Sequence, residues 1–594
     1  MWENRTLLSR ITDRLSQLEL KYNQFQISRD WIVSLFRPDI AIDTEESSRG
    51  NFLGNDIYEG TAPWAARVMA TGLQGNLVSK SIDWIQYLMK QFELRGIDEL
   101  DVMLQDVKDH MTDVYRRSNF YDVQPQFTLN GLTIGSPVMF GEEDIVSGTI
   151  KWMPQHYKHC FVVYNKYNEI DGIIVKDTTF TAKQIYDTFL TEKTPEGKKT
   201  EREKKFSQAL NNAIDMGRMY EEFTILRAVF KKEDSIWQGD KEHQFKKPIG
   251  NQTWYDVYFE ETTEKDKDQP LKSGGHFGRP FVVWDYDKKN YEACSRTPAY
   301  DAIWDTISHQ QVYKNLLENM QYKNRYPKYA LNSMKGRLQL SPEGITYVND
   351  KEYDRPVKGI DVIGDIQYNE KMSAEFKENI KRHFHLDLFQ LFTNVAAAHA
   401  QPLTATQIWQ MAGEKSTLLS PAVETHSHYL KDVDDRMMDI EARAGRGPFN
   451  PDNMAYIAEI LNSKNMKKVG SVGIIPEFIG PLARAQKVQQ AMDPITQSLQ
   501  ASSSLFQVWP DLKFAIKEYD LLDDMLHAGN FPMKNLKTKE DYQKVIDEVN
   551  DQRAQQAKEA SMLEMMKASK NIQGAVDPTS IMAGAGKAMA GSVA

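Results

Sequence analysis

The N-terminal part of the chain carries apolar residues at helical spacing. The first stripe consists of Leu7, Ile11, Leu15 and Leu18. Residues 97–118 carry a second stripe, and both stretches are therefore predicted to be helices. The segment between them, residues 55–79, is rich in alanine and contains Gly72 and Gly75. Small residues of this kind suit close packing of one helix against another.

From Leu129 the pattern changes to short apolar runs bounded by turn residues, which is typical of strands. The runs predicted to form strands are 129–175, 221–230, 252–261 and 279–286. Thr181 and Gln184 have the spacing of a capping box and predict a helix that starts between two of these runs. Residues 192–205 hold charges of alternating sign and are predicted to be a solvated loop or helix face.

Two long helices with a small β insertion between them are predicted after Pro298. The first covers 301–322 and the second 371–392, and residues 325–348 between them read as short strands with turn residues. One face of the second helix is expected to carry Phe376, Ile380, Phe384, Leu388 and Leu391. Each helix would be roughly 30–35 Å long at about 1.5 Å per residue.

The segment after the second helix consists mostly of small residues and contains no constellation of catalytic groups. The apolar helix is expected to end at Phe392, and the chain then runs through the small residues 395–400 to Pro402. Thr404 and Gln407 have capping-box spacing and predict that a new helix begins there. A smooth loop is therefore predicted between two helices.

The chain beyond this loop is predicted to be mainly helical. Ser420–Pro421 is either an N-cap with proline at the first helical position or a kink in a longer helix. Apolar positions then recur at Val423, His426, Leu430, Val433, Met437 and Ile440. Residues 445–452 form a glycine- and proline-rich joint, and helices are expected again from Gly480, before a tail rich in Ala, Gly and Met.

Length and composition restrict the class of protein. With 594 residues, several domains or lobes are expected. The net charge of −10 argues against tight, extensive binding of nucleic acid, because phosphate contacts need a basic surplus. The sequence has neither an apolar run long enough to span a membrane nor a recognisable signal peptide. Cys160 and Cys294 are too few for a disulfide framework, which fits a reducing, cytosolic place of synthesis.

Candidate catalytic and ligand motifs are weak. Residues 412–417 lack the glycine spacing of a phosphate-binding loop and lie in a predicted helix, and the glycines of 274–280 favour a turn.

The histidine pairs make poor metal sites. His383 and His385 are two residues apart, as are His426 and His428, so the members of each pair face different sides of a helix. His426 is expected to be a packed core histidine. The acidic residues of 141–144 favour a solvated turn. No enzyme activity, cofactor or metal is predicted.

Four stretches together resemble one family, the portal or head-to-tail connector proteins of short-tailed bacteriophages (podoviruses). They are residues 58–79, 295–316, 402–421 and 478–486, of which FIGPLARAQ at 478–486 is the most specific. They occur in the family's order in a chain of the right length. Cys294 to Thr297 depart from the family's pattern, which tends to place glycine beside arginine there.

The resemblance implies a mainly helical α+β portal fold assembled as a ring of twelve copies at one vertex of the capsid. The implied parts are a wing (1–298), stem helices (299–324, descending, and 371–392, ascending), a clip (325–370), a tunnel loop (393–402), a long helix returning to the wing (403–479), a crown (480–556) and a C-terminal tail (557–594). A barrel helix is one alternative for this tail. Viral double-stranded DNA would pass through the channel for packaging and ejection. The expected partners are terminase, the tail adaptor, and the major capsid and scaffolding proteins, without a membrane. The protein would be made in the host cytoplasm and reside in the virion.

The resemblance also assigns candidate site residues. The tunnel loop would present Thr393, Asn394, Val395, Ala396, Ala397, Ala398, His399, Ala400 and Gln401 to the DNA. The clip residues expected to contact terminase or adaptor are Lys335, Arg337, Gln339 and Tyr347. Apolar small residues suit a channel wall, because a lysine repeated around a ring would hold the phosphates. The net negative charge points the same way.

Two other classes of protein stay open. Another ring-forming virion component, such as a tail adaptor, is usually shorter and does not need a helix–β–helix insertion before such a loop. A nucleic-acid enzyme, such as a nuclease or motor subunit, would need carboxylates with metal spacing or a phosphate-binding loop. Ring size and position in the capsid separate the first class from a portal. A metal- or ATP-dependent activity would indicate the second.

Overall fold

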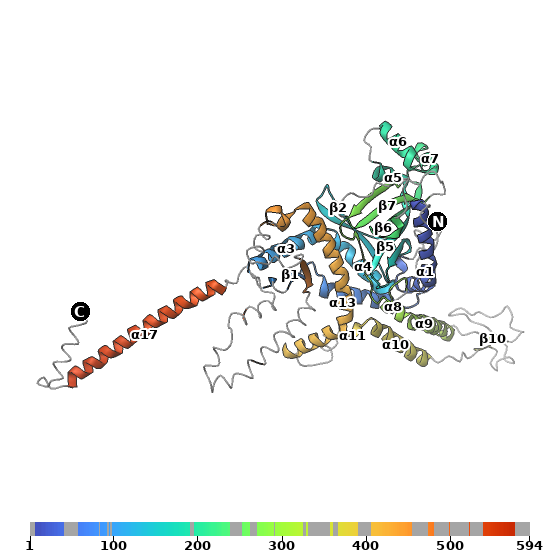
Figure 1. The fold of residues 1–594 in the computed structure, drawn as a ribbon. Helices are drawn as coiled ribbons and strands as arrows, with labels where there is room; N and C mark the ends of the chain where they lie inside the picture. The colour runs from blue at the N-terminus through green and yellow to red at the C-terminus, as the bar shows by residue number, and fades with distance from the viewer. Residues whose placement is uncertain are drawn as a thin grey trace. The chain divides into compact units, whose positions relative to one another are not determined.

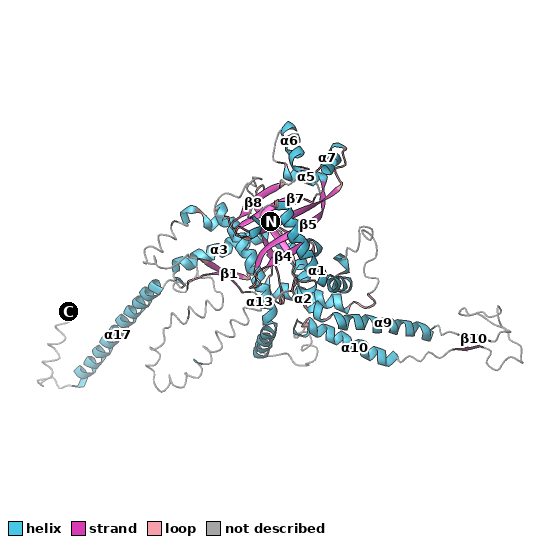
Figure 2. Cartoon of the chain, turned by 45° about the vertical axis from the view of Figure 1, so that its right-hand side comes forward, coloured by secondary structure: helices cyan, strands magenta, loops and turns pink. Residues whose placement is uncertain are grey.

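The computed structural model combines helices with antiparallel sheets, as the sequence predicts (Figures 1 and 2). The residues it describes are 6–40, 57–81, 83–91, 94–95, 98–190, 195–237, 252–261, 270–289, 292–324, 328–330, 357–359, 366–389, 405–453, 455, 473–479, 498, 522 and 539–575. The chain divides into two compact units. The first comprises residues 1–93 and 104–489, and the second comprises 94–103 and 490–594.

The centre of the first unit is a layered β structure. A five-stranded sheet has the order β4-β5-β6-β7-β8, and a three-stranded sheet has the order β3-β2-β9. The strands of the larger sheet are β4 (Cys160–Tyr164), β5 (Ile170–Thr181), β6 (Glu222–Lys231), β7 (Trp254–Glu260) and β8 (Lys272–His276). Those of the smaller sheet are β2 (Val138–Asp144), β3 (Thr149–Pro154) and β9 (Phe281–Val283).

Alternating side chains give the larger sheet two apolar faces. On β6, Leu226, Ala228 and Phe230 face helix α1 (Leu7–Phe36). Val229, between them, packs with residues of β2 and β9 from the smaller sheet. Because successive residues of a strand point to opposite faces, α1 and the smaller sheet lie on opposite sides of the larger one. The predicted stripe of α1 from Leu7 to Leu18 is buried here, which confirms it.

Further helices complete the first unit. They are α2 (Thr61–Leu77), α3 (Asp98–Arg117, of which residues 98–103 are assigned to the second unit), α4 (Phe120–Thr133), α5 (Ala182–Phe189), α6 (Pro195–Lys205), α7 (Gln208–Asp215), α8 (Pro298–Asp301), α9 (Ile303–Asn324), α10 (Ile366–His383), α11 (Leu386–Phe389) and α13 (Ala405–Ala444). Two short antiparallel pairs also form, β1 (Ile85–Met89) with β12 (Ile474–Phe478), and β10 (Lys328–Ala330) with β11 (Val357–Gly359). Short 3-10 turns occur at Pro38–Ile40, Tyr157–His159, Ser235–Trp237 and Gly447–Phe449.

The second unit is described mainly by one helix, α17 (Lys539–Ala575). It continues without a break past residue 557, the start of the C-terminal tail that the family resemblance implies. At about 1.5 Å per residue, its 37 residues span about 55 Å.

Several local predictions are confirmed. Thr181 and Gln184 form the capping box at the start of α5, with both reciprocal hydrogen bonds present. Residues 412–417 lie inside α13, so they are not a phosphate-binding loop at a strand-to-helix turn. Cys160 and Cys294 are buried free thiols. The glycine- and proline-rich joint follows α13 directly, with Gly445 at a φ of +63°.

Three strand and turn predictions are wrong. Residues 129–133 belong to α4 rather than to a strand, because Leu132 and Thr133 pack into the core and the helix ends only before Gly135, at a φ of +82°. Gly274 lies inside the edge strand β8 rather than in a turn, where its backbone pairs with Asp256 of β7. The acidic residues of 141–144 end strand β2 and form ion pairs, among them Glu142 with Arg227 at 2.9 Å, so the solvated-turn prediction is wrong.

The remaining corrections concern helices. Pro421 lies inside the continuous α13, so the N-cap alternative is wrong and the longer helix is right. The predicted helix at 371–392 begins earlier, at Ile366, and is interrupted at His385, whose φ of +51° breaks the helical hydrogen bonding. Residues 195–205 form a helix, α6, which is the helix alternative of the prediction, but Arg202 departs from a solvated face because it is buried and paired with Asp215 at 2.6 Å. A side chain added at Gly75 would meet open space, so the close packing of α2 falls on its alanines instead.

Candidate functional site

The site residues predicted from the sequence lie outside the described residues. This holds for the whole tunnel loop, Thr393 to Gln401, and for the clip residues Lys335, Arg337, Gln339 and Tyr347. The capping residue Thr404 also falls outside, although α13 begins at Ala405, immediately after it. The candidate site is therefore described through the elements that lead into the loop and out of it: the helix pair α9–α10 with α11 before the loop, and α13 after it.

Helices α9 and α10 run antiparallel and side by side (Figures 1 and 2). Near the start of α9, Asp305 pairs with His383 at 3.1 Å. One turn further along α9, His309 is bonded through Nε2 to the hydroxyl of Ser373 at 3.0 Å. As the residue number increases along α9, the residue number of its contact partner in α10 decreases, as expected of two antiparallel helices. The predicted long helix at 301–322 is thereby confirmed as α9.

A group of polar side chains around Glu59 fastens this pair to the body of the first unit; we call it the Glu59 cluster. Its members are Glu59, Thr61, His309, Gln310, Ser373 and Lys377. The Glu59 carboxylate accepts the amide and the hydroxyl of Thr61, each at 2.8 Å, at the start of α2. It also pairs with Lys377 of α10 at 3.2 Å and lies 3.5 Å from His309 of α9. One carboxylate thus joins three helices.

Gln310 closes the Glu59 cluster through the backbone. Its side-chain oxygen accepts the amides of Tyr58 and Glu59, at 2.8 and 3.1 Å, and its side-chain nitrogen donates to the Glu59 carbonyl at 2.7 Å. Burial opposes ionisation of Glu59, yet the hydrogen bonds from Thr61 and the nearby Lys377 outweigh it and lower the Glu59 pKa. Burial lowers the pKa of His309. The cluster therefore favours an ionised Glu59 beside a neutral His309.

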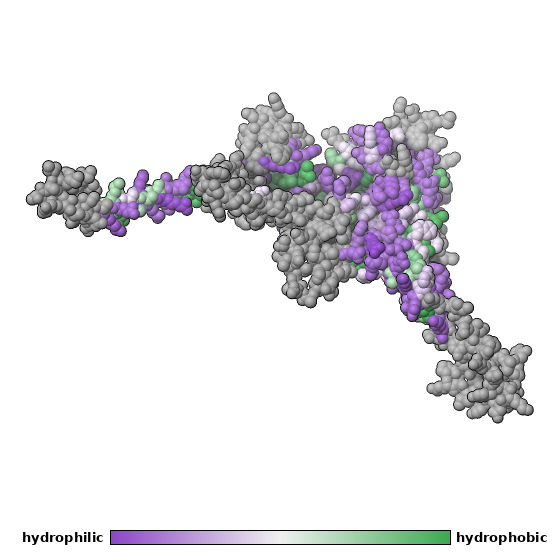
Figure 3. Space-filling view, turned by 90° about the horizontal axis from the view of Figure 1, so that it is seen from below, coloured by the Kyte–Doolittle hydropathy of each residue, from purple (hydrophilic) through white to green (hydrophobic). Residues whose placement is uncertain are grey.

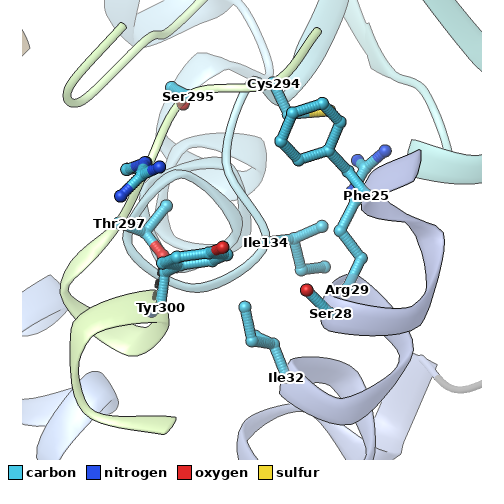
Figure 4. Close-up of a pocket in the computed structure, with 10 residues that line it drawn as sticks. Phe25, Ser28, Arg29, Ile32, Ile134, Cys294, Ser295, Thr297 and Tyr300 are labelled. Carbon is cyan, nitrogen blue, oxygen red and sulfur yellow. Dashed lines mark hydrogen bonds between the residues drawn. The ribbon is translucent and has the colours of Figure 1, made fainter. Parts of the chain in front are cut away.

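The start of the helix pair is fixed against α4, although Cys294 to Thr297 depart from the family's pattern. Thr297 caps α8 by accepting the amide of Tyr300 at 3.2 Å, and its hydroxyl donates to the Thr133 carbonyl at 2.7 Å. Ser295 and Ser136 exchange hydrogen bonds from backbone amide to hydroxyl, at 2.9 and 3.0 Å. Figure 4 shows Ser295 and Thr297 on one side of a small pocket and Phe25 and Ser28 of α1 on the other, with Cys294 beside the Phe25 ring.

The helix after the predicted loop, α13, is anchored along its second half. Leu430, Val433 and Met437 are fully buried, as the apolar spacing predicts. His426 is also fully buried and packs edge-on against Trp284 and Tyr429, with ring centroids 5.2 and 4.6 Å apart. Burial lowers the pKa of His426 to about 3. The prediction of a packed core histidine is confirmed.

Buried polar residues tie α13 to its neighbours. Asp434 accepts the hydroxyls of Tyr87 from β1 and Tyr115 from α3, at 2.7 and 3.2 Å. Burial raises the pKa of Asp434 to about 7, although the two tyrosine hydrogen bonds act in the opposite direction. Arg436 donates to the Gly141 carbonyl of β2 at 3.1 Å. The helix that leaves the predicted loop is therefore held by three different elements.

Sequence reasoning missed the Glu59 cluster and the Asp434 contacts. Glu59 and Gln310 are 251 residues apart, and Tyr87 and Asp434 are 347 apart. Periodicity reports only neighbours on one element, so no local pattern could pair them. In the described part of the chain, no group of three His, Cys, Asp or Glu side chains is arranged to hold a metal. Likewise, none of the described helices is long and apolar enough to cross a membrane.

Comparison with known proteins identifies the family. The sequence model of a family described as bacteriophage head to tail connecting protein matches residues 8–536. The portal protein of Salmonella phage epsilon15 is 21% identical over 488 residues, which cover 79% of this chain and 81% of that protein. The probable portal protein of Bordetella phage BPP-1 is 21% identical over 450 residues, covering 75% of this chain and 73% of that protein. The chain belongs to the family of bacteriophage head to tail connecting proteins.

Proposed function

We propose that this protein is a portal, a structural ring at one vertex of a phage capsid through which the genome enters and leaves. The observation that carries the proposal is the family match across residues 8–536. We further propose a ring of twelve copies that surrounds viral double-stranded DNA. The ring docks terminase during packaging and a tail adaptor afterwards, and contacts the major capsid and scaffolding proteins. It is made in the host cytoplasm and ends in the virion.

The antiparallel helix pair supports an assignment to the stem. Beyond Leu316 in α9, and before Ser373 in α10, none of the side chains described in these helices is buried. These halves therefore present side chains on all sides, as expected of helices that neighbouring copies cover. The chain between the two helices, with the β10–β11 pair, is proposed to be the clip.

The loop between α11 and α13 is proposed to line the channel. Its sequence from Val395 to Ala400 contains neither lysine nor arginine, and His399 is its one titratable residue. Each copy in a ring repeats the same loop, so one lysine would become a circle of positive charge around the duplex. Several added phosphate contacts would hold the DNA and slow its movement. The loop's composition thus suits sliding, while the anchored α13 fixes where the loop ends.

The first test is electron microscopy of purified full-length protein viewed end-on. Twelvefold rings with an open channel are expected. A stable ring of six, or a compact particle without a channel, would overturn the portal proposal and favour another kind of virion component or an enzyme.

The channel assignment is tested in infected cells with Ala397→Lys. This variant is expected to assemble rings but to package DNA more slowly or to retain the genome poorly. The matched control is Tyr167→Lys at an exposed hairpin between β4 and β5, which should package normally. Normal packaging and genome retention by Ala397→Lys would overturn the assignment of this loop to the channel.

A further inference from the structure

The outward face of α1 is apolar, although the helix already buries its opposite face. Leu20, Ile27 and Trp31 are seven and four residues apart, so they form one row along the helix. All three are exposed, and Ile27 retains 71% of its accessible surface. The row lies opposite the stripe that packs on the five-stranded sheet, whose last members include Leu18 and Tyr22. This helix is therefore apolar on two sides.

The same outward face carries no charge over five turns. From residue 16 to residue 34 its polar members are Ser16, Gln17, Asn23, Gln24 and Ser34. An exposed helix face is ordinarily charged, and Figure 3 shows a view in which most of the described surface is hydrophilic. Depletion of charge together with a large aromatic residue, here Trp31, is the composition of an interface core.

A second exposed apolar feature is the turn between β2 and β3. Ile145 and Val146 stand at its tip, and Val146 is 98% exposed. The turn has a defined shape, because Asp144 accepts the amide of Gly148 through its carbonyl at 2.8 Å and that of Val146 through its carboxylate at 3.1 Å. Lys151 pairs with the same carboxylate at 2.6 Å. Two branched apolar side chains are thus presented to solvent by a pre-organised turn.

These two features lie on opposite sides of the first unit. Helix α1 covers one face of the five-stranded sheet, and the sheet containing β2 and β3 packs on the other. Figure 1 shows α1 and β2 on opposite sides of β5, β6 and β7. A closed ring needs two different patches on each copy, one to meet each neighbour. Ile145, Val146 and the residues of the outward row are all uncharged. Packing the turn on the row would therefore remove no charge of these residues from water.

We propose that the Ile145–Val146 turn of one copy packs on the outward face of α1 in the next copy, against Leu20, Ile27 and Trp31. The proposal rests on the ring proposed above and names the surfaces through which two copies meet. It accounts for both exposed apolar features with one contact, repeated around the ring.

Engineered disulfide bonds test this contact directly, because the native Cys160 and Cys294 are buried. The variant Ile27→Cys/Val146→Cys, oxidised in the full-length assembled protein, is expected to give a ladder of covalent oligomers on a non-reducing gel. An equimolar assembly of the two single variants should stop at dimers, because each chain then offers only one reactive partner. Each single variant alone should stay uncrosslinked. Ile27→Cys/Tyr167→Cys is the control and should give no ladder.

The outcomes separate this contact from the portal function. Rings visible by electron microscopy without a ladder from Ile27→Cys/Val146→Cys would overturn the contact and leave the function standing. Dimers from Ile27→Cys alone would show that two α1 helices meet each other, which also overturns it. Absence of rings from the unmodified protein would overturn both proposals.

As a second readout, Ile27→Lys is expected to reduce the ring fraction at least tenfold, and Ile27→Lys/Val146→Glu to restore it.

Discussion

Helix α13 and the α9–α10 pair flank the same predicted loop but are held in different ways. Along α13, buried residues recur at each turn from Ala422 to Ile440 and contact three other elements. In the helix pair, the polar contacts to the body gather around one carboxylate, that of Glu59. Buried side chains also hold the body end of the pair, among them His309 and Ile380, but beyond Leu316 and before Ser373 none of the described side chains is buried. An element that is buried along its length opens only with the core, whereas a segment with little buried surface can open locally. The end of the pair away from the body is therefore expected to open more readily than α13.

The largest expected effect comes from replacing one tryptophan in the region around α13. Trp284 is 1% exposed and packs between Gly131 of α4 and His426 of α13. Trp284→Ala is expected to lower the free energy of unfolding by about 3–5 kcal/mol, through lost burial and the cavity left behind. The measurement is chemical denaturation followed by far-ultraviolet circular dichroism.

The same substitution in the helix pair is the matched control. Trp304 near the start of α9 is 75% exposed. Trp304→Ala should change the free energy of unfolding of the single chain by less than about 0.5 kcal/mol, because little surface is withdrawn from contact. Equal losses from the two variants would contradict the contrast between the regions.

A smaller, local effect is expected from Glu59→Ala. Removing the carboxylate leaves the amide of Thr61 and the side chains of His309 and Lys377 without it, at a cost of about 2 kcal/mol. Because the Glu59 carboxylate contacts both helices, amide hydrogen exchange should become roughly tenfold or more faster in α9 and α10. Exchange in β5 and β6 should stay unchanged.

Glu318→Ala on the exposed side of α9 is the control for this variant and should leave the exchange rates as they are. Uniformly faster exchange over the sheets as well would mean that the Glu59 cluster belongs to the same cooperative unit as the core. In that case, the helix pair would not move independently.

The sequence predicted elements better than it predicted their junctions. Alternating runs located the strands, and the capping box placed the start of α5, because both signals are local. The break at His385 was missed, since Phe384 and Leu386 on either side are buried and look like one continuous apolar face. The Glu59 cluster could not be predicted, because its members come from three distant segments. The tunnel-loop and clip residues stay predictions.

The outward row of α1 shows a different limit. Its members Leu20, Ile27 and Trp31 have the same helical spacing as the buried stripe. Periodicity identifies apolar faces but does not say whether the same chain or another one covers them. Only the arrangement of the sheets shows that one face of α1 is filled by its own core.

The smallest predicted effect concerns a single buried carboxyl group in the region around α13. Asp434 has a pKa of about 7 in the folded protein, against about 3.9 in an unfolded chain. The folded state therefore binds the proton more tightly. The contribution of Asp434 to stability is largest below about pH 4, decreases as pH rises towards 7, and is lost above that.

Asp434→Asn keeps an acceptor for Tyr87 and Tyr115 but cannot ionise. At pH 8 it should therefore be more stable than the unmodified protein by about 1 kcal/mol.

Denaturation at pH 5 and pH 8 checks this difference, which should shrink or reverse at the lower pH because the native carboxyl group is then protonated. Comparing the variant with the unmodified protein at each pH cancels the titration of the neighbouring Asp435, whose pKa is also raised by burial. Asp187→Asn, at an exposed position of α5, is the control and should show no such pH-dependent gain. A gain of the same size at both pH values would mean that the asparagine improves packing. A loss of stability at both pH values would mean that the hydroxyls of Tyr87 and Tyr115 keep Asp434 ionised. The buried charge would then stabilise the region around α13.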